Sequence, residues 1–217
     1  FGEEAMRKLR AWIENDGMRD HHLTVLVNRA ARLPVLYEYL KEEFGIEVTN
    51  DIIVETDNSR VYANIPFQVF GDAGVVEFTE NFKDKKVLSL YTRRLITHKP
   101  YDTNKGYYNA QLVTFPSSAK LINLDEGENA QIRDADEYPV VGMAFAQKEY
   151  TARSANMLVH TYVLVCGSED FLLDAILTSI GTAENENLFM TVYNHMSTGD
   201  ENVTISGIVH FDPVNHH

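Results

Sequence analysis

Cysteine is nearly absent from this chain of 217 residues, which contains a single one, Cys166. One thiol excludes an internal disulfide and every zinc site built from paired cysteines, and the metalloprotease motif HExxH does not occur either. The lack of disulfides leaves the compartment open, because a bacterial extracytoplasmic domain can fold without them. The sequence therefore predicts neither a bound metal nor a cofactor.

Long apolar runs and phosphate-binding loops are also missing. No apolar stretch approaches the roughly 20 residues that a membrane-spanning helix needs, and no signal peptide opens the chain. The chain begins at Phe1 and Gly2 without an initiator methionine, so we expect a fragment of a longer protein whose membrane segments lie outside it. Neither GxGxxG nor GxxxxGK(S/T) can be found, so nothing in the sequence indicates nucleotide binding.

Positive charge is scarce. The chain has 19 Lys and Arg residues against 32 Asp and Glu residues, and its net charge of −13 argues against binding to nucleic acid or to an anionic membrane surface. The few basic residues that cluster are interrupted by acids and favour a solvated face: Lys83, Lys85, Lys86, Arg93 and Arg94. A hydrophobic share of 44% allows a substantial core, and we expect one α/β domain over residues 1–205 and a tail at 206–217.

Helical and extended patterns alternate over the first 55 residues. Apolar residues recur at helical spacing in 3–16 and 33–44, and short apolar or β-branched runs occupy 23–27 and 46–55. Gly17 ends the first helix, while Pro34 and Gly45 suit the start and the end of the second. Helix, strand, helix, strand is the order expected of an α/β layer.

The middle of the chain is less regular. Residues 61–70 are interrupted by Pro66, which suits an edge strand or a loop, and 79–82 can start a short helix. Further strands are predicted at 87–91, 111–115 and 140–148, and the last of these turns back at 152–156 to pair antiparallel with 161–165. Residues 203–211 have strand character without a visible partner. We therefore expect a mixed sheet with an antiparallel edge.

One strand-turn-helix unit, residues 159–196, is the clearest local pattern. An apolar run from 162 to 166 breaks at Gly167, and a helical period follows through Leu188, Phe189, Val192, Tyr193 and Met196. In parallel α/β sheets, ligands meet such a turn at the carboxyl end of the strand. The predicted binding residues are those of this turn and of the polar turn after the strand at 23–27: Ser168, Glu169, Asp170, Asn28 and Arg29.

Cys166 and Ser168 are candidates for a nucleophile, but the surrounding residues favour structural roles. Acyl-transfer enzymes hold Ser or Cys on an elbow, G-x-(S/C)-x-G, and Cys166 has Leu164 and Ser168 in place of the glycines. A buried strand cysteine is therefore favoured. Ser168 is favoured as the N-cap of a helix whose first turn carries Glu169 and Asp170, with a hydroxyl nucleophile or a cation site as alternatives.

The histidines and tyrosines carry weaker signals. Histidines at positions 21, 22, 98, 160, 195 and 210 show no metal-ligand spacing, so structural roles are favoured, and a catalytic pairing of His195 with Cys166 stays open as an alternative. An ordinary surface loop is also favoured over sugar or partner binding for the tyrosine-rich segment. That segment contains Lys99, Tyr101, Lys105, Tyr107 and Tyr108.

Three stretches resemble auxiliary proteins of GldG-type ABC transport systems, which are named for bacterial gliding motility and are widespread in other bacteria. Residues 3–57 share a helix ending in Asn-x-Gly, a strand, and a Leu-Pro-led helix that ends in Gly-Ile. The segments EFTENFKDKKVLSLYTRRL and QLVTFPSSAKLI fit more loosely. Residues 162–203 resemble the family's closing unit, a strand ending in Gly-(D/S)-x-Asp-Phe and an Asn-x-x-Leu-Phe helix, here Gly167-Ser168-Glu169-Asp170-Phe171 and Asn187-Leu188-Phe189.

The resemblance implies a layered α/β fold similar to flavodoxins and class I glutamine amidotransferases, with helices on both faces of the sheet. It implies a non-enzymatic accessory domain on the extracytoplasmic face of the bacterial cytoplasmic membrane, anchored by segments outside this chain. Its implied partners are an ABC-2-type permease and the ATPase of that system, with a small solute or glycan as a further candidate. A carbohydrate-binding module and a degenerate hydrolase or amidotransferase remain as alternatives.

Overall fold

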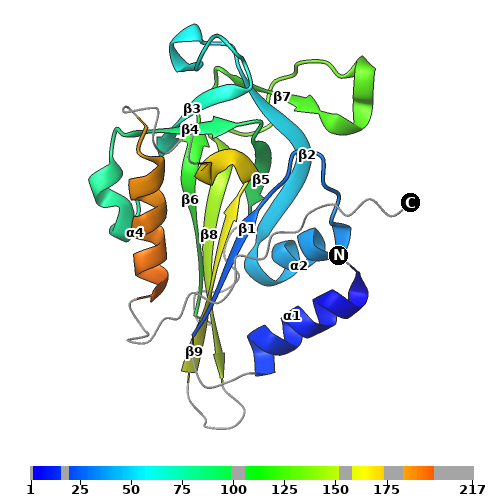
Figure 1. Cartoon of the computed structure of the whole chain (residues 1–217), viewed down its shortest axis with the longest axis vertical. Coiled ribbons are helices and arrows are strands. Elements are labelled where there is room, and N and C mark those ends of the chain that lie inside the picture. The colour runs from blue at the N-terminus through cyan, green and yellow to red at the C-terminus, as the bar shows by residue number, and fades with distance from the viewer. Residues whose placement is uncertain (1, 16–19, 99–105, 152–157, 174–182, 198–217) are drawn as a thin grey trace.

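A computed structural model describes residues 2–15, 20–98, 106–151, 158–173 and 183–197 (Figure 1). It contains a sheet of nine strands: β1 (His21–Leu26), β2 (Ile46–Glu55), β3 (Gln68–Ala73), β4 (Lys86–Leu90), β5 (Arg93–Thr97), β6 (Tyr107–Phe115), β7 (Ala119–Asn123), β8 (Val140–Thr151) and β9 (Leu158–Cys166). The α-helices of the described part are α1 (Glu3–Asn15), α2 (Pro34–Phe44) and α4 (Asn185–Ser197). Its short 3-10 helices are η1 (Asn58–Arg60), η2 (Glu77–Phe82), η4 (Leu124–Asn129) and η5 (Glu169–Leu172).

The sheet is antiparallel apart from one pair of strands. The strands follow the order β4-β3-β6-β8-β5-β2-β7, and β9 pairs with β8 on one side and with β1, in parallel, on the other. The predicted flavodoxin-like or amidotransferase-like layered α/β sheet is therefore wrong, and the domain is mostly β. The early helix-strand alternation does not continue, because in the described residues between β3 and β9 no α-helix connects consecutive strands, and parallel neighbours need such crossovers.

Local patterns were more informative than the overall class. The first four predicted elements appear as α1, β1, α2 and β2, each with ends within two residues of the prediction. Gly45 ends α2 in the left-handed conformation, φ 61°, and its N–H bonds the carbonyls of the last helical turn. The predicted antiparallel return of β8 onto β9 runs from Met143 opposite Cys166 to Thr151 opposite Leu158.

Helices cover both faces of the sheet (Figure 1). Because side chains alternate along a strand, β8 sends Met143 and Phe145 into one core and Ala144 and Ala146 into the other. The first core lies under α4, which contributes Leu188, Val192 and Met196. The second lies under α1 and α2 and includes Met6, Ile13, Leu36, Leu40 and Phe44.

Two glycines allow the sheet to divide beside β8. Val141 pairs with β5, whereas the residues from Met143 onward pair with β9, so β5 and β9 share one edge of β8. At the division, Gly167 N–H donates to the Gly142 carbonyl at 2.8 Å, and Arg93 N–H donates to the Gly167 carbonyl at 2.8 Å. A Cβ on Gly167 would lie 2.2 Å from the Arg93 carbonyl oxygen, so only glycine fits.

Two outer strands of the sheet are closed by other parts of the chain. Along β4, Glu184 N–H donates to the Lys86 carbonyl at 3.0 Å, and the side chain of Asn185 bonds both backbone groups of Leu88. Along β7, Leu121 and Arg133 exchange two backbone hydrogen bonds of 2.9 Å. These contacts satisfy backbone groups that an open edge would expose.

Candidate functional site

The parallel pair β1–β9 brings the carboxyl ends of two strands to the same edge of the sheet. Pairing runs from His21 opposite Thr161 to Leu26 opposite Cys166, and Val27 N–H then donates to the Cys166 carbonyl at 2.8 Å. The two turns that follow these strands therefore lie side by side. The predicted binding residues all belong to these turns: Asn28, Arg29, Ser168, Glu169 and Asp170.

Asn28 ties the two turns together. Its Nδ2 donates to Oε1 of Glu169 at 2.6 Å. Its Oδ1 accepts from the N–H groups of Ala30 at 2.7 Å and Ala31 at 3.0 Å, which is the bonding of an Asx turn. The side chain of Asn28 thus holds the loop after β1 in its own turn and also joins it to Glu169 of η5.

Arg29 and Asp170 give the site charges of both signs. The Arg29 guanidinium carbon lies 4.6 Å from the ring centre of Tyr91, within the range of a cation–π contact. Burial raises the pKa of Asp170 above its ordinary value, the charge of Glu169 raises it further, and Arg29 opposes both effects. An anionic ligand group would meet Arg29, and a cationic group near Asp170 would favour the ionised carboxylate.

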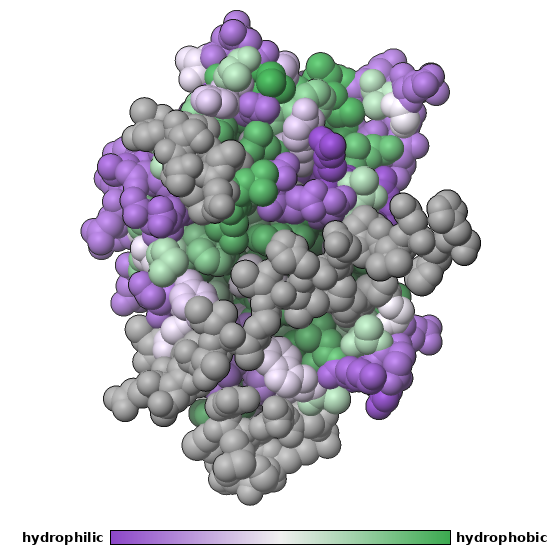
Figure 2. All heavy atoms as spheres, in the orientation of Figure 1, coloured by the Kyte–Doolittle hydropathy of each residue, from purple (hydrophilic) through white to green (hydrophobic). Residues whose placement is uncertain are grey.

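An open depression of about 500 Å³ adjoins these turns. Its lining combines apolar side chains with two guanidinium groups: Arg29, Ala30, Arg32, Ile52, Phe67, Tyr91, Ile122 and Leu124. Phe67 and Tyr91 stack with ring centres 5.5 Å apart and planes at 14°. In the view of Figure 2, hydrophobic residues gather near the top of the molecule, between regions covered by hydrophilic residues. The volume suits a small molecule or a few side chains of a partner.

Arg93 supports the loop over residues 28–33 from below. Its Nη1 donates to the Ala31 carbonyl at 2.7 Å, its Nε to the Thr49 carbonyl at 2.8 Å and its Nη2 to Oδ1 of Asn50 at 2.6 Å. Burial lowers the pKa of this guanidinium below its ordinary value. The predicted solvated face is wrong for Arg93 and Arg94, which are 0% and 5% exposed because β5 lies inside the sheet.

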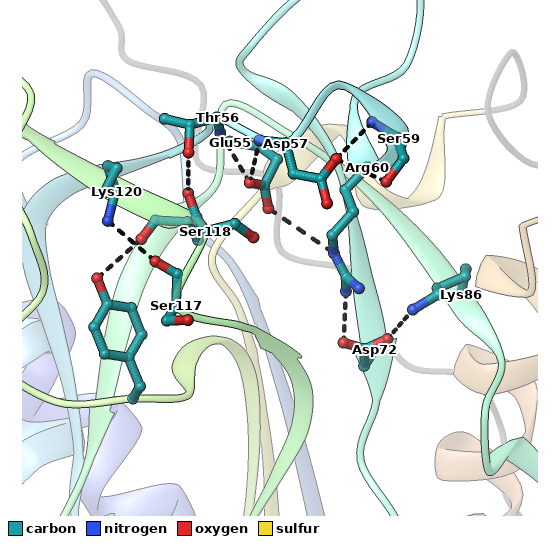
Figure 3. Close-up of polar contacts among 12 residues, drawn as sticks. Glu55, Thr56, Asp57, Ser59, Arg60, Asp72, Lys86, Ser117, Ser118 and Lys120 are labelled. Atoms are coloured by element: carbon teal, nitrogen blue, oxygen red, sulfur yellow. Dashed lines mark hydrogen bonds and ion pairs between the residues drawn. The ribbon is translucent and has the colours of Figure 1, made fainter.

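A second group of charged residues joins β2, η1, β3 and β4 (Figure 3). Glu55 is buried, and its Oε1 accepts from the N–H groups of the next two residues at 2.8 and 2.9 Å. Its Oε2 lies 3.9 Å from Nε of Arg60, whose Nη2 lies 2.5 Å from Oδ2 of Asp72, and Asp72 also pairs with Lys86. Each of these carboxylates faces a cation, so the group holds the four elements together through ion pairs. Within the described ranges, no three His, Cys, Asp or Glu side chains gather as metal ligands.

The two candidate nucleophiles, Cys166 and Ser168, have buried side chains with structural roles. Cys166 is 2% exposed, and burial raises its pKa to about 12, so the thiolate that nucleophilic attack requires is strongly disfavoured. Ser168 is also buried, and its Oγ donates to the Leu90 carbonyl at 2.6 Å. It holds the N-cap position of η5 without a capping bond, so the predicted capping role is wrong. Its hydroxyl instead ties the end of β9 to β4.

The predicted histidine and tyrosine candidates have structural contacts where they are described. His195 stacks on Phe78 with ring centres 3.9 Å apart, and burial lowers its pKa. Tyr107 is buried and donates to the Phe44 carbonyl, whereas Tyr108 is 41% exposed. Several predictions lie outside the described residues: those for Gly17, Lys99, Tyr101, Lys105, His210, the turn at 152–156, the strand at 203–211 and the tail at 206–217.

Four residues of the site were missed from the sequence. Arg32, Phe67, Tyr91 and Arg93 reach it from the loop after β1 and from segments 60–95, which the sequence does not connect to the turn at 167–170. Of these four, only Arg32 could have been predicted, because it lies close to Arg29 in the sequence.

In the part of the chain that the structure covers, no helix has the length and apolarity to cross a membrane. No family model, curated protein or solved structure matches the chain.

Proposed function

We propose that this chain is a non-enzymatic binding domain, an extracytoplasmic accessory of an ABC-2-type transport system, and that it binds a partner protein or solute at the carboxyl ends of β1 and β9. The observation that carries the proposal is the meeting of Asn28 and Arg29 with Glu169 and Asp170 beside the apolar depression. Such a site combines orienting charges with an apolar surface, as binding sites commonly do.

The family resemblance contributes the transport role, not the fold. Its two best-fitting stretches, residues 3–57 and 162–203, supply β1 and β9, which pair over six consecutive residues. The flavodoxin-like sheet that the resemblance implies is absent, so the transport role rests on the resemblance of the sequence stretches alone. The candidate site lies on the two strands that these stretches supply, which is why we place partner binding there.

The site favours an amphipathic group with a negative charge. Arg29 is exposed and makes a cation–π contact, and Arg32 pairs with Asp125 at 2.9 Å on the surface. Surface ion pairs contribute little and exchange readily, so both guanidinium groups can turn to a ligand carboxylate or phosphate. The rings of Phe67 and Tyr91 would contact its apolar part.

The alternatives have less support from the described side chains. A hydrolase or amidotransferase using Cys166 or Ser168 would need a free nucleophile, and both side chains are buried and engaged. A glycan site on the tyrosine-rich segment would need several exposed rings, and of the two described tyrosines Tyr108 is exposed whereas Tyr107 is buried with its hydroxyl bonded to a carbonyl.

Purification of the full-length protein from its native membrane tests the proposal. We expect the permease and the ATPase to accompany the wild-type protein, and less of both to accompany Arg29→Ala. Arg10→Ala is the matched control, because Arg10 is also exposed over a tyrosine ring, at 4.8 Å from Tyr39, but lies on α1. Recovery of the wild-type protein without either subunit would refute the transport role. Equal recovery with Arg29→Ala and Arg10→Ala would refute the site.

A further inference from the structure

The depression beside the turns after β1 and β9 brings three guanidinium groups together in an acidic chain. Arg29 and Arg32 line it, and Arg93 lies under the loop that carries both, bonded to the carbonyl of Ala31. The chain as a whole has 19 basic residues against 32 acidic ones. This local excess of guanidinium groups favours a ligand with a negatively charged group.

Arg29 is the guanidinium best placed to bind that group. It is exposed, and its guanidinium carbon lies 4.6 Å from the ring centre of Tyr91. A guanidinium that rests on a ring can still direct its fork of N–H donors to a carboxylate. Asn28 holds the backbone of this loop in its turn, and the ring restricts the side chain. Arg29 is thus partly ordered before a ligand arrives, which lowers the entropic cost of binding.

The backbone of Tyr91 is strained at this position. Its φ of 47° lies in the left-handed region, which a bulky side chain rarely adopts. Its N–H donates to the Phe67 carbonyl at 2.8 Å, and its ring stacks on the ring of Phe67. The strained conformation therefore holds the ring in contact with both Phe67 and Arg29 in the lining of the depression. Strain of this kind is concentrated at binding and catalytic sites.

The acids around the depression favour a ligand with a single negative charge. Asp125 pairs with Arg32 at 2.9 Å. Glu169 and Asp170 lie in the turn that Asn28 joins to the loop of Arg29. A phosphate dianion would be repelled by these carboxylates more strongly than a carboxylate would. One guanidinium can bind one carboxylate through two parallel hydrogen bonds, so Arg29 suffices for a monocarboxylate.

We propose that the depression binds a small monocarboxylate with an apolar body, whose carboxylate pairs with Arg29 and whose body lies against Phe67 and the aliphatic lining. That lining consists of Ile52, Ile122 and Leu124. The inference rests on the binding site proposed above and names the class of solute that this site takes. The volume of about 500 Å³ is sufficient for such a molecule.

A free acid fits the depression better than the end of a peptide chain does. A peptide would bring backbone N–H and C=O groups that need hydrogen-bond partners when they leave water. Ile122 belongs to β7, and the outer edge of β7 is already bonded to Arg133 through two backbone hydrogen bonds at Leu121. A solute with one charged group needs only Arg29 and the apolar lining.

Titration calorimetry of this chain with naphthylacetate, a flat apolar monocarboxylate, tests the proposal. We expect saturable binding to the wild type and to Arg10→Ala, and binding at least about tenfold weaker to Arg29→Ala, because the bond to the charged carboxylate is lost. Naphthylacetamide has the same body without the charge and should also bind about tenfold more weakly to the wild type. Naphthyl phosphate should bind more weakly than naphthylacetate.

Asp125→Asn tests the contribution of Arg32 with an effect of the opposite sign. Asp125 is exposed and pairs with Arg32, so its replacement frees that guanidinium and removes a negative charge from the depression. We expect naphthylacetate to bind about threefold more tightly or better. Glu128→Gln removes a negative charge at an exposed position of the same short helix, η4, and is the control that should leave the affinity unchanged.

Three results would overturn the inference. The first is no saturable binding of naphthylacetate to the wild type, or equal binding to Arg29→Ala and Arg10→Ala. The second is naphthylacetamide or naphthyl phosphate binding as tightly as naphthylacetate. The third is a short peptide with a free C-terminal phenylalanine binding more tightly than naphthylacetate, since the site would then take a chain end.

These outcomes are separate from those of the membrane purification. If naphthylacetate does not bind but recovery of the permease and the ATPase still depends on Arg29, the solute class is wrong and the proposed function stands. If naphthylacetate binds through Arg29 but neither subunit accompanies the wild-type protein, the transport role is wrong and the solute class stands.

Discussion

Replacing Asn185 by alanine tests how the sheet is closed at β4. Asn185 is 1% exposed and stands at the start of α4. Its Oδ1 accepts from Leu88 N–H at 2.9 Å, and its Nδ2 donates to the Leu88 carbonyl at 2.8 Å and to the Phe171 carbonyl at 3.3 Å. The side-chain amide thus substitutes for the peptide group of a further strand.

The expected cost follows from the groups that alanine would leave unpaired. Leu88 is fully buried, so neither its N–H nor its C=O can turn to water. A buried backbone group without a partner costs about 1–3 kcal/mol, so the free energy of unfolding should fall by about 2–6 kcal/mol. Such a loss is a large share of the roughly 5–15 kcal/mol that stabilises a typical domain.

Urea denaturation of Asn185→Ala and Asn187→Ala measures this difference. Asn187 lies on the same helix, but it is exposed and its side chain donates to Glu184. Its replacement should change the free energy of unfolding by less than about 0.5 kcal/mol. If Asn185→Ala lost no more stability than Asn187→Ala, the side chain of Asn185 would not be what closes β4.

Three further predictions concern the interior. Gly167→Ala should lower the free energy of unfolding by about 4 kcal/mol or more, because the new Cβ meets backbone oxygens of Arg93 and Gly142, and Gly2→Ala, with open space around it, is the control. Cys166 should resist iodoacetamide in the native protein and react in urea. Because burial raises the pKa of its thiol from 9 to about 12, the neutral thiol should contribute to stability below pH 9, and this contribution should decrease as the pH approaches 12. Burial depresses the pKa of His195, so its contribution to stability is present above pH 6.5 and lost as the pH falls, and His195→Phe should flatten that acid limb in thermal unfolding.

The sequence predicted local elements well because their signals are local. The helix 34–44 is bounded by Pro34 and by Gly45, and both act at the predicted ends. The fold class failed because it extended the pattern of the first 55 residues to the whole chain. Pairings such as β3 with β6 or β2 with β7 join distant segments, and no short-range period in the sequence encodes them.

The five predicted binding residues lie in adjacent turns in spite of the wrong fold class, for a physical reason. In an antiparallel sheet, neighbouring strands end at opposite edges, so the turns after them are separated. β1 and β9 are parallel, and the turns after them meet, as the rule for the carboxyl ends of parallel strands states. The same rule could not indicate Arg93, since its role comes from bonds to carbonyls on β2 and on the loop after β1.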